Sequence, residues 1–481
     1  IAMKPDNNRI VLIRPPTGAP RLSFLSLQPP INLAYLASAV RQADFQVEIW
    51  DYGIAPYSRD ELEARLQRFR PGIVGITCLT PTIPFGYEIA KAVKEISPDT
   101  VLVMGGSHSS ALPQRTLEEC PALDTVVVGE GEQSLRECVE RVRSGSSLAG
   151  CPGLAHRHGG SITVESPRPL ISPLDELPFP ARELLDRERY AKVQHSRGIS
   201  EEYGPQTEIF TSRGCPGRCI FCAVNVNYGS RVRFRSVENV LAEVEECRGR
   251  FGIRHFIIQD DTFNLRESRV ADLMRGFRGL GVPSFSCDAR VDTVSRDMLE
   301  EMARSGCRKI SFGVESGSPR ILALNGKGIT RDQVVQAFEW ARKVGIELLE
   351  ATFMIGSHPD ETVEDVRLTQ NLIREIRPDI LFCSVAVPYP GTELRTLLQE
   401  AGCYPVEESW EHFGMFTNAP VWRTFHFSPE ELVRTRDRVL RSYYFTPQYV
   451  LSRLGKLRSG SEAKYWICAG MDYLRATFRG R

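Results

Sequence analysis

The chain has 481 residues, enough for two to four domains of about 100–200 residues each. Sixty Lys and Arg balance sixty Asp and Glu, so the sequence lacks the overall basic field that gathers nucleic acid, and 42% hydrophobic residues exclude a wholly disordered chain. No run of about 18 uncharged apolar residues occurs, and the start of the chain has no apolar signal core. The thirteen Cys are spread over the whole chain, which fits free thiols in a reducing compartment better than a set of disulfides. We therefore expect a cytoplasmic protein.

The first segment alternates short β-branched runs with helix-length intervals. Strands are expected at 9–14, 46–50, 72–77, 101–104 and 125–128, with helices at 32–43 and 83–96. This order predicts a Rossmann-like parallel α/β sheet over residues 1–150. Ligands of such a sheet belong at the carboxyl ends of its strands.

Six prolines interrupt residues 151–200, which we therefore interpret as a linker without regular elements. A second strand series is expected at 207–211, 256–259, 284–287, 309–313, 348–355 and 380–387. Six strands, each followed by a helix-length interval, predict a partial (β/α)6 barrel over 201–395 that is open on one side.

Helical patterns rich in aromatic residues follow from 396 to 481 and predict a small, mostly helical C-terminal domain. The aromatic side chains either form its core or cover an apolar substrate. Residues 447–481 carry seven Lys or Arg against two acidic residues. This excess fits a solvated basic tail and also permits docking on an anionic membrane surface.

The most informative stretch is a cysteine triplet on a Gly-rich loop after an expected strand. Cys215, Cys219 and Cys222 are separated by three and then two residues. Soft sulfur ligands select zinc or iron–sulfur clusters. Zinc sites usually have four ligands, and no fourth Cys or His lies close by. Three thiolates would leave one iron of a cubane open, so the spacing favours a [4Fe–4S] cluster over zinc or three unrelated buried thiols.

The triplet and the β/α series over 206–395 resemble the radical S-adenosylmethionine (SAM) enzymes. The resemblance implies that the open iron chelates the amino and carboxylate groups of SAM, and that one electron from the cluster cleaves SAM to a 5′-deoxyadenosyl radical. It implies SAM contacts by Phe221, Asp260, Asp261, Arg290, Glu315, Ser316, Ile355 and Gly356. The usual Gly-Gly-Glu is absent at 260–261, and either Asp there could instead cap the next helix.

The amino-terminal segment resembles the cobalamin-binding domain that precedes the barrel in one large subclass of these enzymes, through residues 29–37 and the glycine-bearing loops after the fourth and fifth strands. The implied cobalamin contacts are Thr77, Cys78, Leu79, Thr80, Gly105, Gly106, Ser107, His108, Gly129, Glu130 and Gly131. The Asp-x-His-x-x-Gly signature is absent. The lower cobalt face would then meet the loop 77–81 without His ligation, or the domain has lost cobalamin and serves as a scaffold.

The resemblance thus implies an enzyme with a [4Fe–4S] cluster, SAM and cobalamin, which methylates an unactivated carbon of a small molecule. A second possibility within the family is a radical rearrangement, cyclisation or ring contraction of a lipid or tetrapyrrole-like substrate. The cysteine triplet would also suit an RNA-modifying methylthiotransferase or a binding protein with a structural cluster. The resemblance further implies an external electron donor such as flavodoxin or ferredoxin. Tyr389 is a candidate for the catalytic residue facing the substrate.

Overall fold

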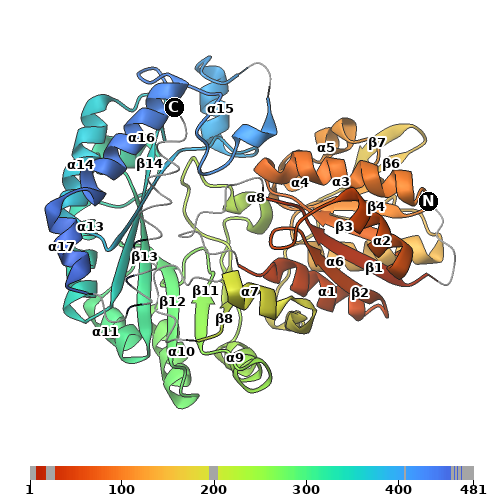
Figure 1. Ribbon diagram of the computed structural model, residues 1–481, viewed down its shortest axis with the longest axis horizontal. Helices are drawn as coiled ribbons and strands as arrows, with labels where there is room; N and C mark the ends of the chain where they lie inside the picture. Colours follow the sequence, from red (N-terminus) through yellow and green to blue (C-terminus); the bar gives the residue numbers. More distant parts are fainter. Residues whose placement is uncertain are drawn as a thin grey trace.

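Two β-sheets covered by helices lie side by side, with the short helix α8 (Val224–Tyr228) between them (Figure 1). The computed structural model describes residues 7–17, 28–193, 204–405 and 408–456, with the single positions 460, 463 and 467 beyond them. The α/β architecture expected from the alternation of strands and helices is confirmed.

The amino-terminal sheet has seven strands in the order β2-β1-β3-β4-β5-β6-β7. Its parallel strands are β1 (Arg9–Arg14), β2 (Gln46–Asp51), β3 (Ile73–Thr77), β4 (Val101–Gly105) and β5 (Thr125–Val127). The helices on its two faces are α1 (Ile31–Arg41), α2 (Arg59–Phe69), α3 (Ile83–Ile96), α4 (Ser107–Ala111), α5 (Pro113–Glu119) and α6 (Gly131–Ser144). Because helices cover both faces, β1, β3 and β4 read as continuous apolar runs, whereas the edge strand β2 has polar residues between its apolar ones.

The expectation that residues 151–200 lack regular elements is wrong for their first part. β6 (Leu154–His158) and β7 (Ser161–Val164) extend the sheet as antiparallel strands. Five of the six prolines of this segment follow β7, so they do not interrupt the hairpin. The short turns η2 (Leu174–Glu176) and η3 (Arg182–Leu184) and helix α7 (Arg187–Val193) then lead toward the second sheet.

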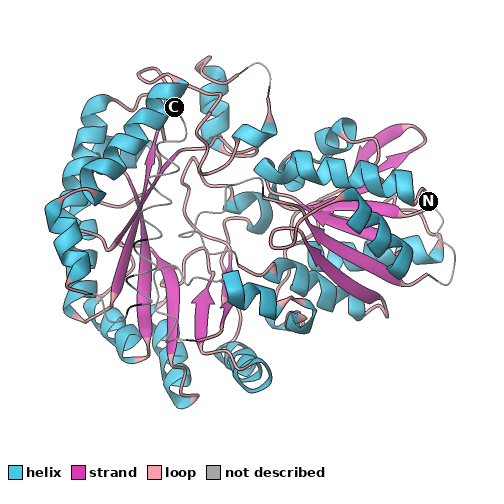
Figure 2. Cartoon of the chain, in the orientation of Figure 1, coloured by secondary structure: helices cyan, strands magenta, loops and turns pink. Residues whose placement is uncertain are grey.

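The second sheet, whose strands are magenta among cyan helices in Figure 2, has six parallel strands in the order β15-β14-β13-β12-β11-β8. They are β8 (Gln206–Ile209), β11 (His255–Ile258), β12 (Ser284–Ala289), β13 (Cys307–Glu315), β14 (Leu348–Ile355) and β15 (Ile380–Val385). The helices covering the outer face are α9 (Val237–Phe251), α10 (Glu267–Gly279), α11 (Arg296–Arg304), α12 (Pro319–Leu324), α13 (Arg331–Lys343) and α14 (Val363–Ile376). Within the described ranges the edge strands β8 and β15 do not pair with each other, which confirms the open partial barrel.

The C-terminal part is mostly helical, as expected. It contains α15 (Glu393–Glu400), η5 (Trp410–His412), α16 (Pro429–Tyr444) and α17 (Pro447–Leu454). The side chains of Phe413 and Trp422 are completely buried, so these two rings belong to the core. The basic segment 447–481 lies largely outside the described residues. No helix in the described part of the chain is long and apolar enough to cross a membrane.

Candidate active site between the two sheets

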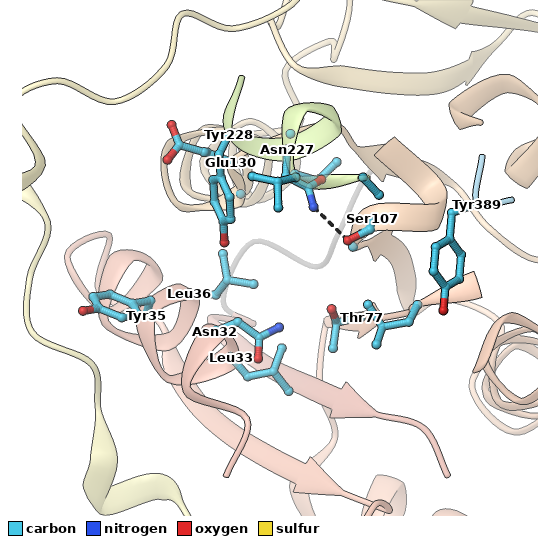
Figure 3. Close-up of a pocket in the computed structure, with 18 of the residues that line it drawn as sticks. Asn32, Leu33, Tyr35, Leu36, Thr77, Ser107, Glu130, Asn227, Tyr228 and Tyr389 are labelled. Carbon is cyan, nitrogen blue, oxygen red and sulfur yellow. Dashed lines mark hydrogen bonds between the residues drawn. The ribbon is translucent and has the colours of Figure 1, made fainter. Parts of the chain in front are cut away.

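A cavity of about 580 Å³ lies where the carboxyl ends of the two sheets face each other (Figure 3). Thr77 and Gly105, at the ends of β3 and β4, belong to its amino-terminal wall, and Met354 and Val385, at the ends of β14 and β15, belong to its barrel wall. The size and the largely apolar lining are those of a small-molecule or cofactor site. The position agrees with the rule that ligands of parallel sheets bind at the carboxyl ends of strands.

The amino-terminal wall contains most of the residues expected to contact cobalamin. The residues of that set that line the cavity are Thr77, Leu79, Gly105, Gly106, Ser107, Gly129, Glu130 and Gly131. Cys78, Thr80 and His108 are buried and are not among the lining residues. The His108 ring packs edge-on against Trp410 at 4.6 Å, and burial lowers the pKa of His108 to about 3. His108 is therefore a neutral core residue in this structure.

Backbone forms the centre of this wall. Gly106 has a φ of +103°, and a Cβ on it would stand 2.3 Å from the carbonyl oxygen of Cys78. The two loops are held together by a hydrogen bond from Cys78 N to Gly105 O at 2.9 Å. Only glycine fits at position 106, and because glycine has no side chain, a bulky ligand can approach the backbone there. Asn227 of α8 donates to Ser107 at 2.8 Å and so connects this wall to the barrel side (Figure 3).

The cysteine triplet lies on the loop between β9 (Ser212–Arg213) and α8. All three thiols are partly buried, and burial raises the pKa of Cys222 to about 11. Two of the sulfurs, those of Cys215 and Cys219, lie 3.3 and 3.8 Å from the point where a Cβ on Gly217 would stand. Among the described residues no three His, Cys, Asp or Glu side chains converge on a single metal ion. Thiolates are the ligands that hold iron–sulfur clusters, so the chemistry of this donor set fits such a cluster.

Backbone contacts hold this loop against the barrel. Ile220 N donates to Asn325 O at 3.1 Å, and Leu394 N donates to Ile220 O at 2.8 Å. Gly214, at a φ of +90°, begins the loop, and a Cβ there would stand 2.6 Å from the carbonyl oxygen of Arg231. Since Asn325 and Leu394 lie more than 100 positions along the chain from Ile220, the loop is positioned by tertiary structure.

The two adjacent aspartates after β11 have different environments. The carboxylate of Asp260 accepts bonds from Thr211 N at 2.6 Å, from Ser212 N at 3.1 Å and from both of their hydroxyls, and it is buried. Asp261 accepts from Gly214 N at 2.9 Å, at the start of the cysteine loop. Burial raises the pKa of Asp261 to about 6. Asp260 therefore supports the β8–β9 turn, and Asp261 is the carboxylate beside the loop.

Two pairs of oppositely charged side chains lie on the barrel side of the cysteine loop. Nη1 of Arg290 is 3.5 Å from the Cβ position of Gly217, while Nε and Nη2 pair with Asp292 at 2.9 Å. Glu315, with a φ of +72°, accepts from Lys327 Nζ at 2.9 Å. Sequence reasoning missed Lys327 and Asp292. The glycines at 326 and 328 on either side of Lys327 were the local signal of a tight loop.

The remaining expected SAM contacts are dispersed. Ser316 is buried and lies 3.3 Å from the hydroxyl of Thr369 on α14, and Ile355 is completely buried. Gly356 N donates to the carboxylate of Glu361, which sequence reasoning missed. Burial raises the pKa of Glu361 to about 8.

Two aromatic residues from the expected set line the cavity on the barrel side. Phe221 lies on the cysteine loop, and Tyr389 follows β15. Burial raises the pKa of Tyr389 to about 12, so its phenol is neutral at physiological pH. Phe221 therefore connects the cysteine loop directly to the cavity.

Comparisons with known proteins agree with this arrangement. The Radical SAM superfamily profile matches residues 209–373, and the B12 binding domain profile matches residues 21–139. The chain is 35% identical over 445 residues to the uncharacterized methyltransferase PH0819 of Pyrococcus horikoshii, covering 92% of this chain and 94% of the relative. It is 27% identical to an anaerobic magnesium-protoporphyrin IX monomethyl ester cyclase of Rubrivivax gelatinosus, covering 90% and 76%.

Among solved structures, the fold is similar to that of the radical SAM methyltransferase TsrM of Kitasatospora setae with cobalamin and a [4Fe–4S] cluster bound. The TM-score is 0.72 at 18% identity, covering 98% of this chain and 99% of that one. The extent of the match to PH0819, together with the two domain profiles, establishes the family. The chain belongs to the radical SAM superfamily, among the members with an amino-terminal B12-binding domain, and is an enzyme whose cofactors are a [4Fe–4S] cluster, SAM and cobalamin.

Proposed function

We propose that the protein is a methyltransferase that adds a methyl group to an unactivated carbon of a small molecule. The observation that supports this most is that a single cavity is lined both by the glycine loops of the B12-binding domain and by Phe221 of the cysteine loop. One substrate carbon could therefore lie near both groups of cofactors, which is the positioning such a reaction requires. When bound, the cofactors supply a hydrogen-abstracting radical and a transferable methyl group.

The cysteine loop would hold the cluster through Cys215, Cys219 and Cys222. The three half-buried thiols and the anchored loop support this assignment. Asp261 and Arg290, which flank the loop, would orient the amino and carboxylate groups of SAM.

Farther along the barrel, Glu315 would bind the ribose hydroxyls of SAM, and Ile355 and Gly356 would support the adenine. Ser316 would hold the turn after β13, because its hydroxyl accepts from Ser318 N at 3.2 Å. Asp260 would act through the β8–β9 turn, since both its oxygens already accept bonds from that turn.

The cobalamin would lie on the wall formed by Gly105, Gly106 and Gly129, where the backbone leaves room for it. Cys78, Thr80 and His108 would support this wall from behind. The barrel side of the cavity is apolar and would keep water from the reacting carbon. Its apolar residues include Met354, Val387 and Tyr389, and Met415 of the C-terminal part also lines the cavity.

The test is the substitution Cys215→Ala, with Cys247→Ala, a buried thiol on α9, as the control. After anaerobic reconstitution with iron, sulfide and hydroxocobalamin, Cys215→Ala should lose iron and all cleavage of SAM while it retains cobalt. Cys247→Ala should keep near-normal iron. Retained SAM cleavage by Cys215→Ala would overturn the cluster assignment.

A radical rearrangement or cyclisation without methyl transfer is the second candidate, and the similarity to the magnesium-protoporphyrin ester cyclase favours it. The mass of the product separates the two. A gain of one methylene unit supports methylation, whereas an isomer or a dehydrogenated product supports the second candidate. The external electron donor, the membrane contact of residues 447–481 and the domain borders at 150, 200 and 395 stay predictions.

A further inference from the structure

A buried ionic cluster joins the two sides of the cavity. Arg213 donates from Nη1 to Glu130 Oε1 at 2.8 Å and from Nη2 to Glu132 Oε1 at 2.5 Å. The second oxygen of Glu130 accepts from Arg233 Nη1 at 2.7 Å and from Ile171 N at 2.9 Å. The four charged side chains are between 4% and 7% exposed, so this cluster is shielded from solvent.

The buried ionic cluster connects two segments that are far apart in sequence. Glu130 immediately precedes α6 and Glu132 lies in the first turn of α6, on the wall proposed for cobalamin. Arg213 is the last residue of β9 and stands two positions before Cys215. A shift of residues 130–132 would therefore move the guanidinium group of Arg213, and with it the start of the cysteine loop.

The geometry makes this connection stiff. The guanidinium of Arg213 lies 5.5 Å from the ring centre of Tyr35 and 5.6 Å from that of Tyr228. Its two nitrogens bind two different carboxylates, which fixes both its direction and its plane. Two arginines face two glutamates, so the charges balance, and removal of one member leaves a buried charge without its partner.

We propose that Arg213 is a positioning residue that couples cobalamin binding on the amino-terminal wall to formation of the iron–sulfur cluster on the cysteine loop. The inference rests on the proposed function, because it takes the cofactor positions from there. Coupling between two binding sites is reciprocal, so the iron–sulfur cluster should tighten the binding of cobalamin, and cobalamin should stabilise the cluster by the same factor.

The experiment is a pair of anaerobic titrations with hydroxocobalamin, one of the cluster-free protein and one of the reconstituted protein, with iron content measured in each. The wild-type Kd should be at least about fivefold lower with the cluster present, the lower end of typical coupling between sites. In Arg213→Gln the two Kd values should agree within twofold. Arg213→Lys should retain part of the ratio, because it keeps the charge but not the two-pronged geometry.

Arg235→Gln is the matched control. Arg235 forms an equally buried ion pair with Glu243, and both residues lie within the barrel sequence. This variant also loses a buried pair, yet it should keep the wild-type ratio of Kd values. If Arg213→Gln does not fold, Glu132→Gln takes its place, since it removes the charge of the carboxylate that Nη2 of Arg213 binds and leaves the ion pair with Glu130 intact.

The outcomes separate this inference from the proposed function. A wild-type ratio retained in Arg213→Gln or Glu132→Gln overturns the inference, as does a wild-type protein that binds hydroxocobalamin equally well with and without the cluster. Failure of the wild-type protein to bind hydroxocobalamin in either state overturns the cobalamin site of the proposed function itself. A ratio lost in Arg235→Gln as well as in Arg213→Gln overturns the inference by showing a general effect of lost buried pairs.

Discussion

Two adjacent carboxylates, Asp260 and Asp261, should respond in opposite ways to substitution. Asp260→Ala removes the acceptor of two buried backbone N–H groups, those of Thr211 and Ser212, and of their two hydroxyls. The hydroxyls can rotate toward other acceptors, whereas the N–H groups cannot. At about 1–3 kcal/mol for each buried donor left without a partner, Asp260→Ala should cost about 2–6 kcal/mol.

The assay combines thermal unfolding of the cofactor-free protein with SAM binding to the reconstituted protein by equilibrium dialysis. Asp260→Ala should lower the Tm by at least about 4 °C, since 1 kcal/mol corresponds to about 2–4 °C for a domain of this size. Asp260→Asn keeps an oxygen for the N–H groups and should be milder. Asp261→Asn retains an acceptor for Gly214 N, so its Tm should stay near that of the wild type while its Kd for SAM rises about tenfold, the loss expected for one charge-assisted hydrogen bond.

The reverse pattern would refute this reasoning. If Asp260→Ala keeps the wild-type Tm and loses SAM binding, Asp260 contacts SAM and its bonds to the β8–β9 turn are dispensable. If Asp261→Asn binds SAM as the wild type does, the carboxylate beside the cysteine loop has no role in SAM binding.

Three further predictions concern stability. Burial raises the pKa of Glu361 from 4.5 to about 8, so the protonated form stabilises the fold, and this contribution is lost as the pH rises from 4.5 to 8. In urea unfolding, the free energy of unfolding of Glu361→Gln relative to that of the wild type should therefore increase from pH 4.5 to pH 8. A difference that stays constant over this range would contradict the prediction. Gly106→Ala should lose at least about 1–3 kcal/mol and its retention of hydroxocobalamin, because of its φ of +103° and its contact with Cys78, whereas Gly249→Ala on α9, with nothing near its Cβ, should be neutral or stabilising; equal Tm values for both would refute the strain. Phe413→Ala should cost about 3–5 kcal/mol in the same unfolding assay if Phe413 is core, and a much smaller loss would favour a substrate-covering role.

The strands, the helices and the candidate cluster ligands could be predicted from the sequence, because each depends on residues that lie close together along the chain. The strands and helices arise from runs and periods within about 15 residues, so the two sheets and the open barrel could be predicted. Cys215, Cys219 and Cys222 lie within one loop of eight residues, so the candidate cluster ligands could be predicted from their spacing. The hairpin of β6 and β7 escaped prediction because the prolines that follow it dominate the composition of residues 151–200.

Only the tertiary structure decided which polar groups serve the site and which serve the fold. Asp260 and Asp261 are neighbours with the same side chain, yet the β8–β9 turn occupies the first and leaves the second beside the cysteine loop. His108 directly follows Ser107, which lines the cavity, but the ring of His108 packs against Trp410. Arg213 meets carboxylates more than 80 positions away. Such roles depend on which distant groups meet in space, and the local pattern of residues does not contain that information.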